Sequence, residues 1–133
     1  MYHSIVIAVD GSENSFRAAE EAIKLNSKYY TLLSVISHED SKDAILHSEM
    51  SSVERRKLLL KEVIQLFEDK NKRFDLRIEH GNPKEIIINI ANTGTFDMLV
   101  IGNRGLNAIQ EMVMGSVSHK VVKEVNLPVL VVK

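Results

Sequence analysis

The chain has 133 residues, 44% of them hydrophobic, which is enough to bury the core of one domain spanning residues 1–133. Seventeen basic and eighteen acidic residues give a formal net charge of −1, a balance that does not favour a nucleic-acid partner. The sequence has no cysteine, no signal-peptide pattern and no apolar run near the roughly 20 residues of a membrane span, so we expect a cytoplasmic protein without disulfides or a membrane partner.

The first predicted strand covers residues 4–9, a nearly continuous apolar run that is typical of a strand covered on both faces. A polar turn follows at Asp10, and Ser12 is expected to cap the next helix. In that helix Phe16 and Ile23 recur at helical spacing on an apolar stripe. The opening of the chain therefore predicts a strand, a tight turn and an amphipathic helix.

Residues 30–36 predict a second buried strand, and residues 37–52 predict an irregular polar loop. Apolar positions at helical spacing over residues 53–67 then predict one long amphipathic helix. Residues 74–79 alternate between apolar and polar side chains, which predicts an edge strand exposed on one face.

A turn at residues 81–83 places a proline at the start of a further helix, which we expect to end at Gly94. Residues 96–101 predict a fourth strand, residues 117–125 a last helix, and residues 128–132 a fifth strand. Strands that alternate with helices predict an α/β fold, a doubly wound five-stranded parallel sheet with helices on both faces.

The fourth strand runs into the spacing Gly-x2-Gly-x9-Gly-Ser, which begins at Gly102 and ends at Gly115 and Ser116. Glycine lets the backbone approach a ligand closely, and the first turn of a helix presents unpaired N–H groups with the positive end of the dipole. A strand, a glycine-rich loop and a helix start together predict a phosphate site. The alternative interpretation is three turn glycines and a serine cap.

This glycine spacing resembles the nucleotide-binding signature of the universal stress protein family, in its ATP-binding branch. The similarity extends to the stretches at residues 5–15, 32–36, 81–83 and 128–132. It implies an adenine nucleotide alpha hydrolase-like fold with strand order 3-2-1-4-5. Residues 37–52 carry no pattern of the family.

The resemblance also implies roles for individual residues. Ala8, Val9 and Asp10 would line the nucleoside side of the site, and Val35 would contact adenine through its backbone. The remaining residues would approach the ribose and the phosphates: Gly102, Asn103, Arg104, Gly105, Gly115, Ser116, Val117 and Ser118.

Several of these roles have alternatives. Asp10 either shapes the turn or serves the ribose or a metal-bound water, and Arg104 is either a solvated loop charge or a phosphate contact. Ser116 is expected to cap the last helix, with Ser118 near the same N–H groups. The loop at residues 106–114 contains no lysine, so Mg²⁺ bound through the phosphates and Asp10 would help to neutralise ATP.

Three functions follow from these features. The first is an ATP-binding module whose occupancy is a signal, with no catalytic residue and at most slow hydrolysis, since the chain has no Gly-x4-Gly-Lys loop and no evident general base. The second is a nucleotide-free homodimer that acts through protein contacts. The third is an adenylating enzyme, for which the expected Ser-Gly-Gly-x-Asp-Ser motif is absent after the first strand.

We also expect a homodimer, because residues 129–132 would form an apolar edge strand that a second copy can cover. No motif in the sequence identifies the protein partner of such a module, which is therefore unknown. The histidines contain no pair at i, i+4, and the polar stretch from His38 to His47 is explained by loop composition rather than by a metal site.

Overall fold

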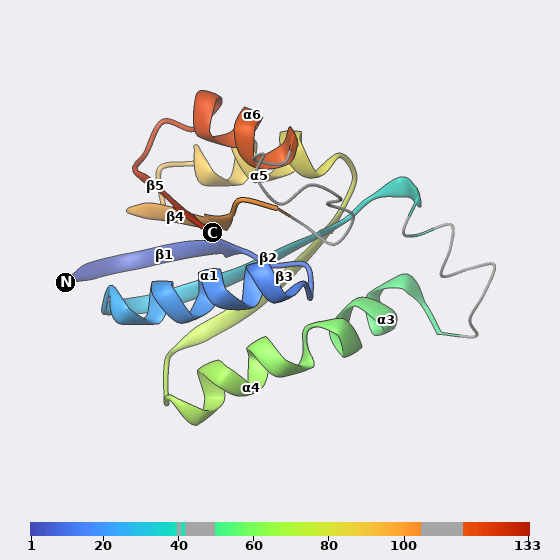
Figure 1. Cartoon of the computed structure of the whole chain (residues 1–133), viewed down its shortest axis with the longest axis horizontal. Helices are drawn as coiled ribbons and strands as arrows, with labels where there is room; N and C mark the ends of the chain where they lie inside the picture. Colours follow the sequence, from blue (N-terminus) through green and yellow to red (C-terminus); the bar gives the residue numbers. More distant parts are fainter. Residues whose placement is uncertain (40, 42–49, 105–115) are drawn as a thin grey trace.

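The computed structural model describes residues 1–39, 41, 50–104 and 116–133. The predicted alternation of strands and helices is confirmed (Figure 1). The elements are β1 (Tyr2–Ala8), α1 (Glu13–Lys24), β2 (Ser27–Ile36), α3 (Ser52–Leu59), α4 (Lys61–Asp69), β3 (Phe74–His80), α5 (Pro83–Ala91), β4 (Met98–Gly102), α6 (Ser116–Glu124) and β5 (Val129–Val132).

The five strands form one parallel sheet in the order β3-β2-β1-β4-β5, as the family resemblance implied. From β1 the chain first winds through β2 to β3 and then crosses to the other side of β1 to form β4 and β5. The direction of winding therefore reverses between β1 and β4, and in doubly wound sheets a ligand crevice is expected at the carboxyl ends of two such strands.

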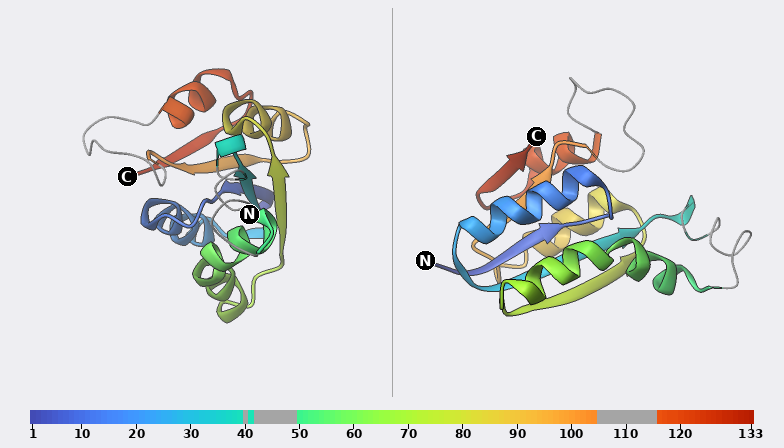
Figure 2. Two further views of the ribbon diagram at one scale, coloured as in Figure 1. Left: turned by 90° about the vertical axis from the view of Figure 1, so that its right-hand side faces the viewer. Right: turned by 60° about the horizontal axis from the view of Figure 1, so that its bottom comes forward.

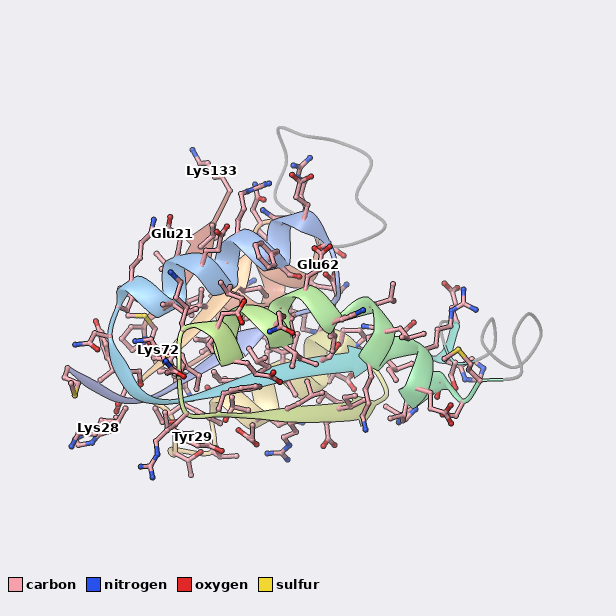
Figure 3. All side chains as sticks on the ribbon, turned by 90° about the horizontal axis from the view of Figure 1, so that it is seen from below. Glu21, Lys28, Tyr29, Glu62, Lys72 and Lys133 are labelled. Carbon is pink, nitrogen blue, oxygen red and sulfur yellow. The ribbon has the colours of Figure 1, made fainter. Side chains whose placement is uncertain are left out.

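Helices cover both faces of the sheet, as predicted (Figure 2). On one face, α1 and α4 pack over a core that includes Ile7, Tyr30 and Phe67. Seen from below, α1 with Glu21 and α4 with Glu62 lie side by side over the sheet (Figure 3). On the other face, α5 and α6 cover a second core around Leu33 and Leu99. Burial on both faces explains the continuous apolar runs of the central strands.

The prediction of one long helix over residues 53–67 is wrong in one respect. Two helical segments meet at Leu60, whose φ and ψ of −91° and 2° depart from helical values. Leu60 is fully buried, and Val63 and Phe67 of α4 pack on the sheet, whereas Arg56 is the buried side chain of α3. The change at Leu60 lets α3 follow the carboxyl end of the sheet while α4 covers its face.

The two sheet edges differ in character. β3 alternates half-buried with exposed or charged side chains, and an ion pair joins Arg77 to Glu79 at 3.2 Å, which agrees with the predicted solvent-facing edge strand. β5 is entirely apolar, and all four of its side chains are half-buried. Charged side chains protect an edge from pairing with another chain, so β5 is the less protected edge.

Candidate functional site

The crevice between β1 and β4 begins with the turn that follows β1. The Asp10 carboxylate Oδ1 accepts a hydrogen bond from the Ser12 N–H at 2.9 Å, and the Ser12 hydroxyl accepts from the Ser15 N–H at 3.1 Å as the predicted helix cap. Gly11 has a φ of +88°, and a Cβ there would lie 2.9 Å from the backbone oxygen of Leu59. Asp10 therefore has the turn-shaping role that the sequence left open beside a ribose or metal role.

Gly102 ends β4 at the other side of the crevice. A Cβ on Gly102 would overlap the side-chain amide of Asn14, whose Cγ would lie only 2.9 Å away. Residue 102 must therefore be glycine because it packs against Asn14 of α1. The spacing of the glycines in the sequence does not show this requirement.

The two residues after Gly102 enter the loop with their backbones anchored. Asn103 N donates to the Val132 carbonyl at 2.9 Å, and Arg104 N donates to the Asn14 side-chain oxygen at 2.9 Å. Their side chains are different: the buried Asn103 Oδ1 and Arg104 Nε make no hydrogen bond within the part of the chain that the structure describes. Buried polar atoms usually have partners, so these two atoms are the candidates in this loop for contact with a polar ligand.

The far side of the glycine loop is formed by the start of α6. Gly105 and Gly115 lie outside the described residues. Among the described residues α6 covers Ser116–Glu124, where Ser116 is exposed and Val117 is half-buried. In general the first N–H groups of a helix have no partner within the helix, which is the basis for anion binding at a helix start.

Ser118 joins the helix start to the end of β4. Its side chain is 4% exposed, and its hydroxyl donates to the Gly102 carbonyl at 2.6 Å. The predicted grouping of Ser118 with Gly102 is thus present in space, although the bond runs to a carbonyl rather than to the helix N–H groups. Ser118 satisfies the last carbonyl of β4 and sets the distance between the strand and the helix.

The other end of the crevice is formed by β1 and β2. Val9 is buried and Ala8 half-buried, and Val9 N donates to the Leu33 carbonyl at 2.8 Å. Backbone groups of alternate residues in a strand face the same side, so the N–H and C=O of Val35 point past the end of β1 toward the crevice. The side chain of Val35 is 8% exposed and packs in the core below α5.

A buried arginine at this end was not predicted from the sequence. Arg56 of α3 is 4% exposed, and its Nη1 donates to the Ser34 hydroxyl at 3.1 Å and to the Val35 carbonyl at 3.5 Å. A signal for its burial was present, since Arg56 stands four, seven and eleven positions before Leu60, Val63 and Phe67 and so shares their helical stripe.

The described residues offer neither a preformed metal cluster nor a membrane segment. No group of three or more His, Cys, Asp or Glu side chains there could hold a metal ion, while Asp40, Asp43 and His47 of the polar stretch lie outside the described part. In the same part of the chain, no helix is long and apolar enough to cross a bilayer.

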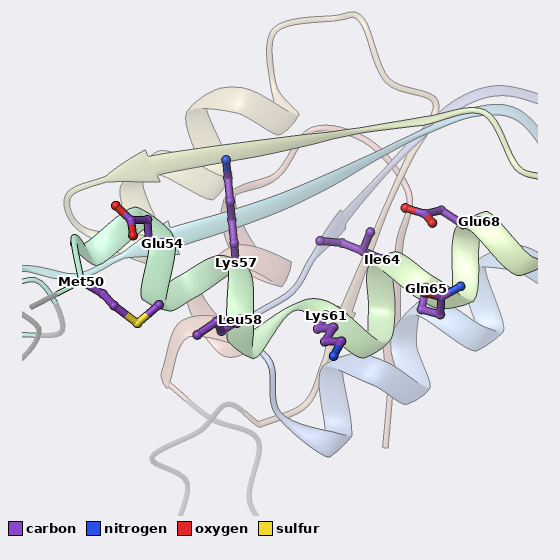
Figure 4. Close-up of a pocket in the computed structure, with 8 residues that line it drawn as sticks. All are labelled: Met50, Glu54, Lys57, Leu58, Lys61, Ile64, Gln65 and Glu68. Carbon is purple, nitrogen blue, oxygen red and sulfur yellow. The ribbon is translucent and has the colours of Figure 1, made fainter. Parts of the chain in front are cut away.

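A separate hollow lies on the outer side of α3 and α4 (Figure 4). It contains none of the crevice residues and mixes acidic with basic side chains, which is typical of a solvated helix face. Its lining consists of Met50, Glu54, Lys57, Leu58, Lys61, Ile64, Gln65 and Glu68.

The strand order and the covering helices define a doubly wound α/β domain, a class of fold in which ligands bind at the switch point of the sheet. The family model described as the universal stress protein family matches residues 1–133, and the chain belongs to this family. It is 28% identical over 149 residues to the universal stress protein YxiE of Bacillus subtilis, with 100% of both chains covered.

Solved structures show the same fold. The protein MJ0577 superposes with a TM-score of 0.76 at 29% identity, covering 100% of this chain and 96% of that one. A universal stress protein in complex with cAMP gives 0.71 at 23% identity, with 99% and 97% covered. A universal stress protein family protein from Arabidopsis thaliana with AMP bound gives 0.73 at 23% identity, with 98% and 91% covered.

Proposed function

We propose that this chain is a signalling module of the stress response that binds an adenine nucleotide, ATP in the first instance, in the crevice between β1 and β4. The observation that carries the proposal is a pair of buried polar atoms without a partner among the described residues, Asn103 Oδ1 and Arg104 Nε, just after β4. The similar proteins with bound cAMP and AMP support an adenine nucleotide as the ligand.

The phosphate end of the proposed site would use polar groups around the glycine loop. Arg104 Nε would donate to a phosphate oxygen and Asn103 Oδ1 would accept from a ribose hydroxyl, which would satisfy both atoms. The helix start at Ser116 and Val117, together with Gly105, Gly115 and Ser118, would complete the anion site.

The nucleoside end would use the ends of β1 and β2. Val35 would offer its backbone N–H and C=O, the donor and acceptor pair that matches the N1 and 6-amino edge of adenine, with the carbonyl also accepting from Arg56 Nη1 at 3.5 Å. Ala8 and Val9 would flank the ribose. Asp10, whose Oδ1 accepts from Ser12, would meet ribose hydroxyls or a water of a phosphate-bound Mg²⁺ ion.

Thermal unfolding and titration calorimetry with Mg-ATP, ADP, AMP and cAMP test the proposal. A ligand that binds only the folded state adds about 2.7 kcal/mol to the free energy of unfolding at 100 times its Kd, so the melting temperature should rise by several degrees. Absence of any shift and of any heat with all four nucleotides at millimolar concentration would leave the nucleotide-free interaction protein as the better function.

We propose further that two copies pair through β5. β5 exposes an apolar edge of four half-buried valine and leucine side chains, whereas the opposite edge, β3, carries Asp75, Arg77 and Glu79. Light scattering should give the mass of a dimer, and Val131→Lys should give that of a monomer because it introduces a charge into the edge strand. Because Val131 also packs against the core around Leu33 and Leu99, the melting temperature of the variant is measured beside its mass. A monomeric mass for the unsubstituted protein would refute this assembly.

A further inference from the structure

Asn14, in the first turn of α1, is a buried polar side chain that connects three segments. Its exposed fraction is 5%. The side-chain Nδ2 donates to the Val132 carbonyl at 3.2 Å, and the side-chain Oδ1 accepts from Arg104 N at 2.9 Å. One amide therefore links the first helix to the end of β5 and to the entry of the glycine loop.

This role is distinct from helix capping. Asparagine in a first helical turn commonly serves the free N–H groups of its own helix, but here Ser12 is the cap and bonds Ser15 N. The Asn14 amide is directed to other segments instead. An asparagine suits the position because it offers one donor and one acceptor without charge, so it bonds an N–H and a carbonyl at once.

The same side chain fits closely against the end of β4. A Cβ on Gly102 would overlap the Asn14 amide, while the next nearest atom, the Asn14 backbone oxygen, would lie at 3.3 Å. The Val132 carbonyl also accepts from Asn103 N at 2.9 Å, so the backbones of residues 103 and 104 are both held by Asn14 or by its partner Val132.

We infer that Asn14 is a positioning residue for the phosphate end of the site. It fixes the backbone of Arg104 and, through Val132, that of Asn103, and thereby the positions of two buried side-chain atoms that have no partner among the described residues, Asn103 Oδ1 and Arg104 Nε. The inference rests on the proposed nucleotide site and adds a residue that lies about 90 positions away from the glycine spacing.

The test compares Asn14→Ala with the double variant Asn14→Ala/Gly102→Ala. Alanine at 14 removes both hydrogen bonds and leaves a void beside Gly102. The second alanine partly fills that void but restores neither hydrogen bond, so it separates packing from positioning. We expect the double variant to recover melting temperature relative to Asn14→Ala, while its affinity for AMP and ATP stays roughly tenfold below that of the unsubstituted protein.

Adenosine is the ligand that isolates the phosphate end, because it has the base and ribose but no phosphate. Its affinity should change less than about threefold in Asn14→Ala, a difference of under 1 kcal/mol. The control is Asn92→Ala, since Asn92 also bridges two backbones, donating to the Glu124 carbonyl at 3.2 Å and accepting from Asn126 N at 2.7 Å, but at the opposite end of the sheet. It should lower the melting temperature and leave the preference for AMP over adenosine unchanged.

Hydrogen exchange supplies a ligand-free measurement. The Arg104 amide should exchange faster in Asn14→Ala and in the double variant than in Asn92→Ala. Equal losses of AMP and adenosine affinity, or unchanged affinity with unchanged Arg104 exchange, would overturn the positioning role while nucleotide binding by the unsubstituted protein stands. Failure of the unsubstituted protein to bind any of the ligands would refute the nucleotide site and the inference with it.

Discussion

The two ends of the sheet use polar side chains differently. At the amino ends of the strands, Asp97 accepts hydrogen bonds from the backbone N–H groups of His3 at 2.6 Å and Ser4 at 3.1 Å, which joins β4 to β1. Asn92 joins the end of α5 to the connection between α6 and β5. These side chains complete hydrogen bonds of the fold itself.

At the carboxyl ends, some side chains bond the backbone, whereas other buried polar atoms have no hydrogen-bond partner among the described residues. Asn14 and Ser118 fix the residues around Gly102, while Asn103 Oδ1 and Arg104 Nε have no partner within the described ranges. The contrast suits a division between stability and function: polar groups that are satisfied within the chain stabilise the fold, and the two buried atoms without partners are the ones that the proposed nucleotide would satisfy.

Gly102→Val, at the carboxyl ends of the strands, should cause the largest loss of AMP affinity. The valine would overlap the Asn14 amide, so we expect the free energy of unfolding to fall by about 1–3 kcal/mol through overpacking. Displacement of Asn14 and Arg104 should reduce AMP affinity by roughly 100-fold, about 2.7 kcal/mol, in a calorimetric titration.

Gly94→Ala is the matched control at the other end of the sheet. Gly94 has a φ of +90°, but a Cβ there would meet no atom of the described residues within 4 Å, so the cost of the substitution is one of backbone strain alone. It should lower the melting temperature without weakening AMP binding. Nucleotide affinity that survives Gly102→Val would show that the loop does not hold the phosphates.

A smaller effect should follow from Ser118→Ala. This change leaves the Gly102 carbonyl without its 2.6 Å donor and costs about 1–3 kcal/mol in the free energy of unfolding. Because the link between β4 and α6 loosens, AMP affinity should fall roughly fivefold, about 1 kcal/mol.

Thr93→Val is the comparison for Ser118. The Thr93 hydroxyl likewise donates to a carbonyl, that of Ile90 at 2.8 Å, but near the amino ends of the strands. Denaturant unfolding should report a loss of stability in both variants, whereas calorimetry should report weaker AMP binding in Ser118→Ala alone. An equal effect of the two variants on AMP affinity would contradict the division between the two ends.

Most of the fold could be predicted from the sequence because its signals are local. Alternating apolar strands and amphipathic helices indicated the parallel sheet, and the period of two over residues 74–79 identified β3 as an edge. The break at Leu60 could not be predicted, since the apolar stripe continues from α3 into α4 and the change of direction depends on which surface each segment covers.

The site was only partly predictable because several of its contacts join residues far apart in the chain. The glycine spacing pointed to Gly102 and to the region of α6. No sequence pattern, however, indicates that Asn14 bonds Arg104, 90 positions later, or that Ser118 bonds the Gly102 carbonyl. The burial of Arg56 was not predicted because an arginine is usually a surface residue. Only the structure shows that the Ser34 hydroxyl lies beside it and accepts its hydrogen bond.

Arg56 allows the nucleoside end to be tested separately. Arg56→Gln removes the donor to the Ser34 hydroxyl and the Val35 carbonyl, so adenosine affinity should fall roughly threefold, about 0.7 kcal/mol, as the end of β2 loosens. Arg55→Gln makes the same change of charge at an exposed neighbour and should alter stability by less than about 0.5 kcal/mol. Equal adenosine affinity in the two variants would show that Arg56 has no role in binding the nucleoside.

The smallest effect on binding should come from Asp97 at the amino end. Backbone hydrogen bonds from His3, and then from Ser4, hold the pKa of the Asp97 carboxyl below its usual value. A carboxyl with a lower pKa in the folded state contributes stability that is fully present above its unfolded pKa, about 3.9, and is lost as the pH falls through the folded value. Asp97→Asn should therefore flatten the decline of melting temperature on acidification below about pH 4.

At neutral pH the same variant separates the two ends of the sheet most cleanly. Asparagine keeps an oxygen that can accept from His3 N and Ser4 N, so the fold is retained with weaker, uncharged hydrogen bonds. AMP affinity at pH 7 should equal that of the unsubstituted protein because Asp97 contacts β1 at the end opposite to the crevice. A loss of AMP affinity in Asp97→Asn without a loss of melting temperature would mean that residues at the amino ends of the strands also affect nucleotide binding. The proposed separation of stability from binding would then be wrong.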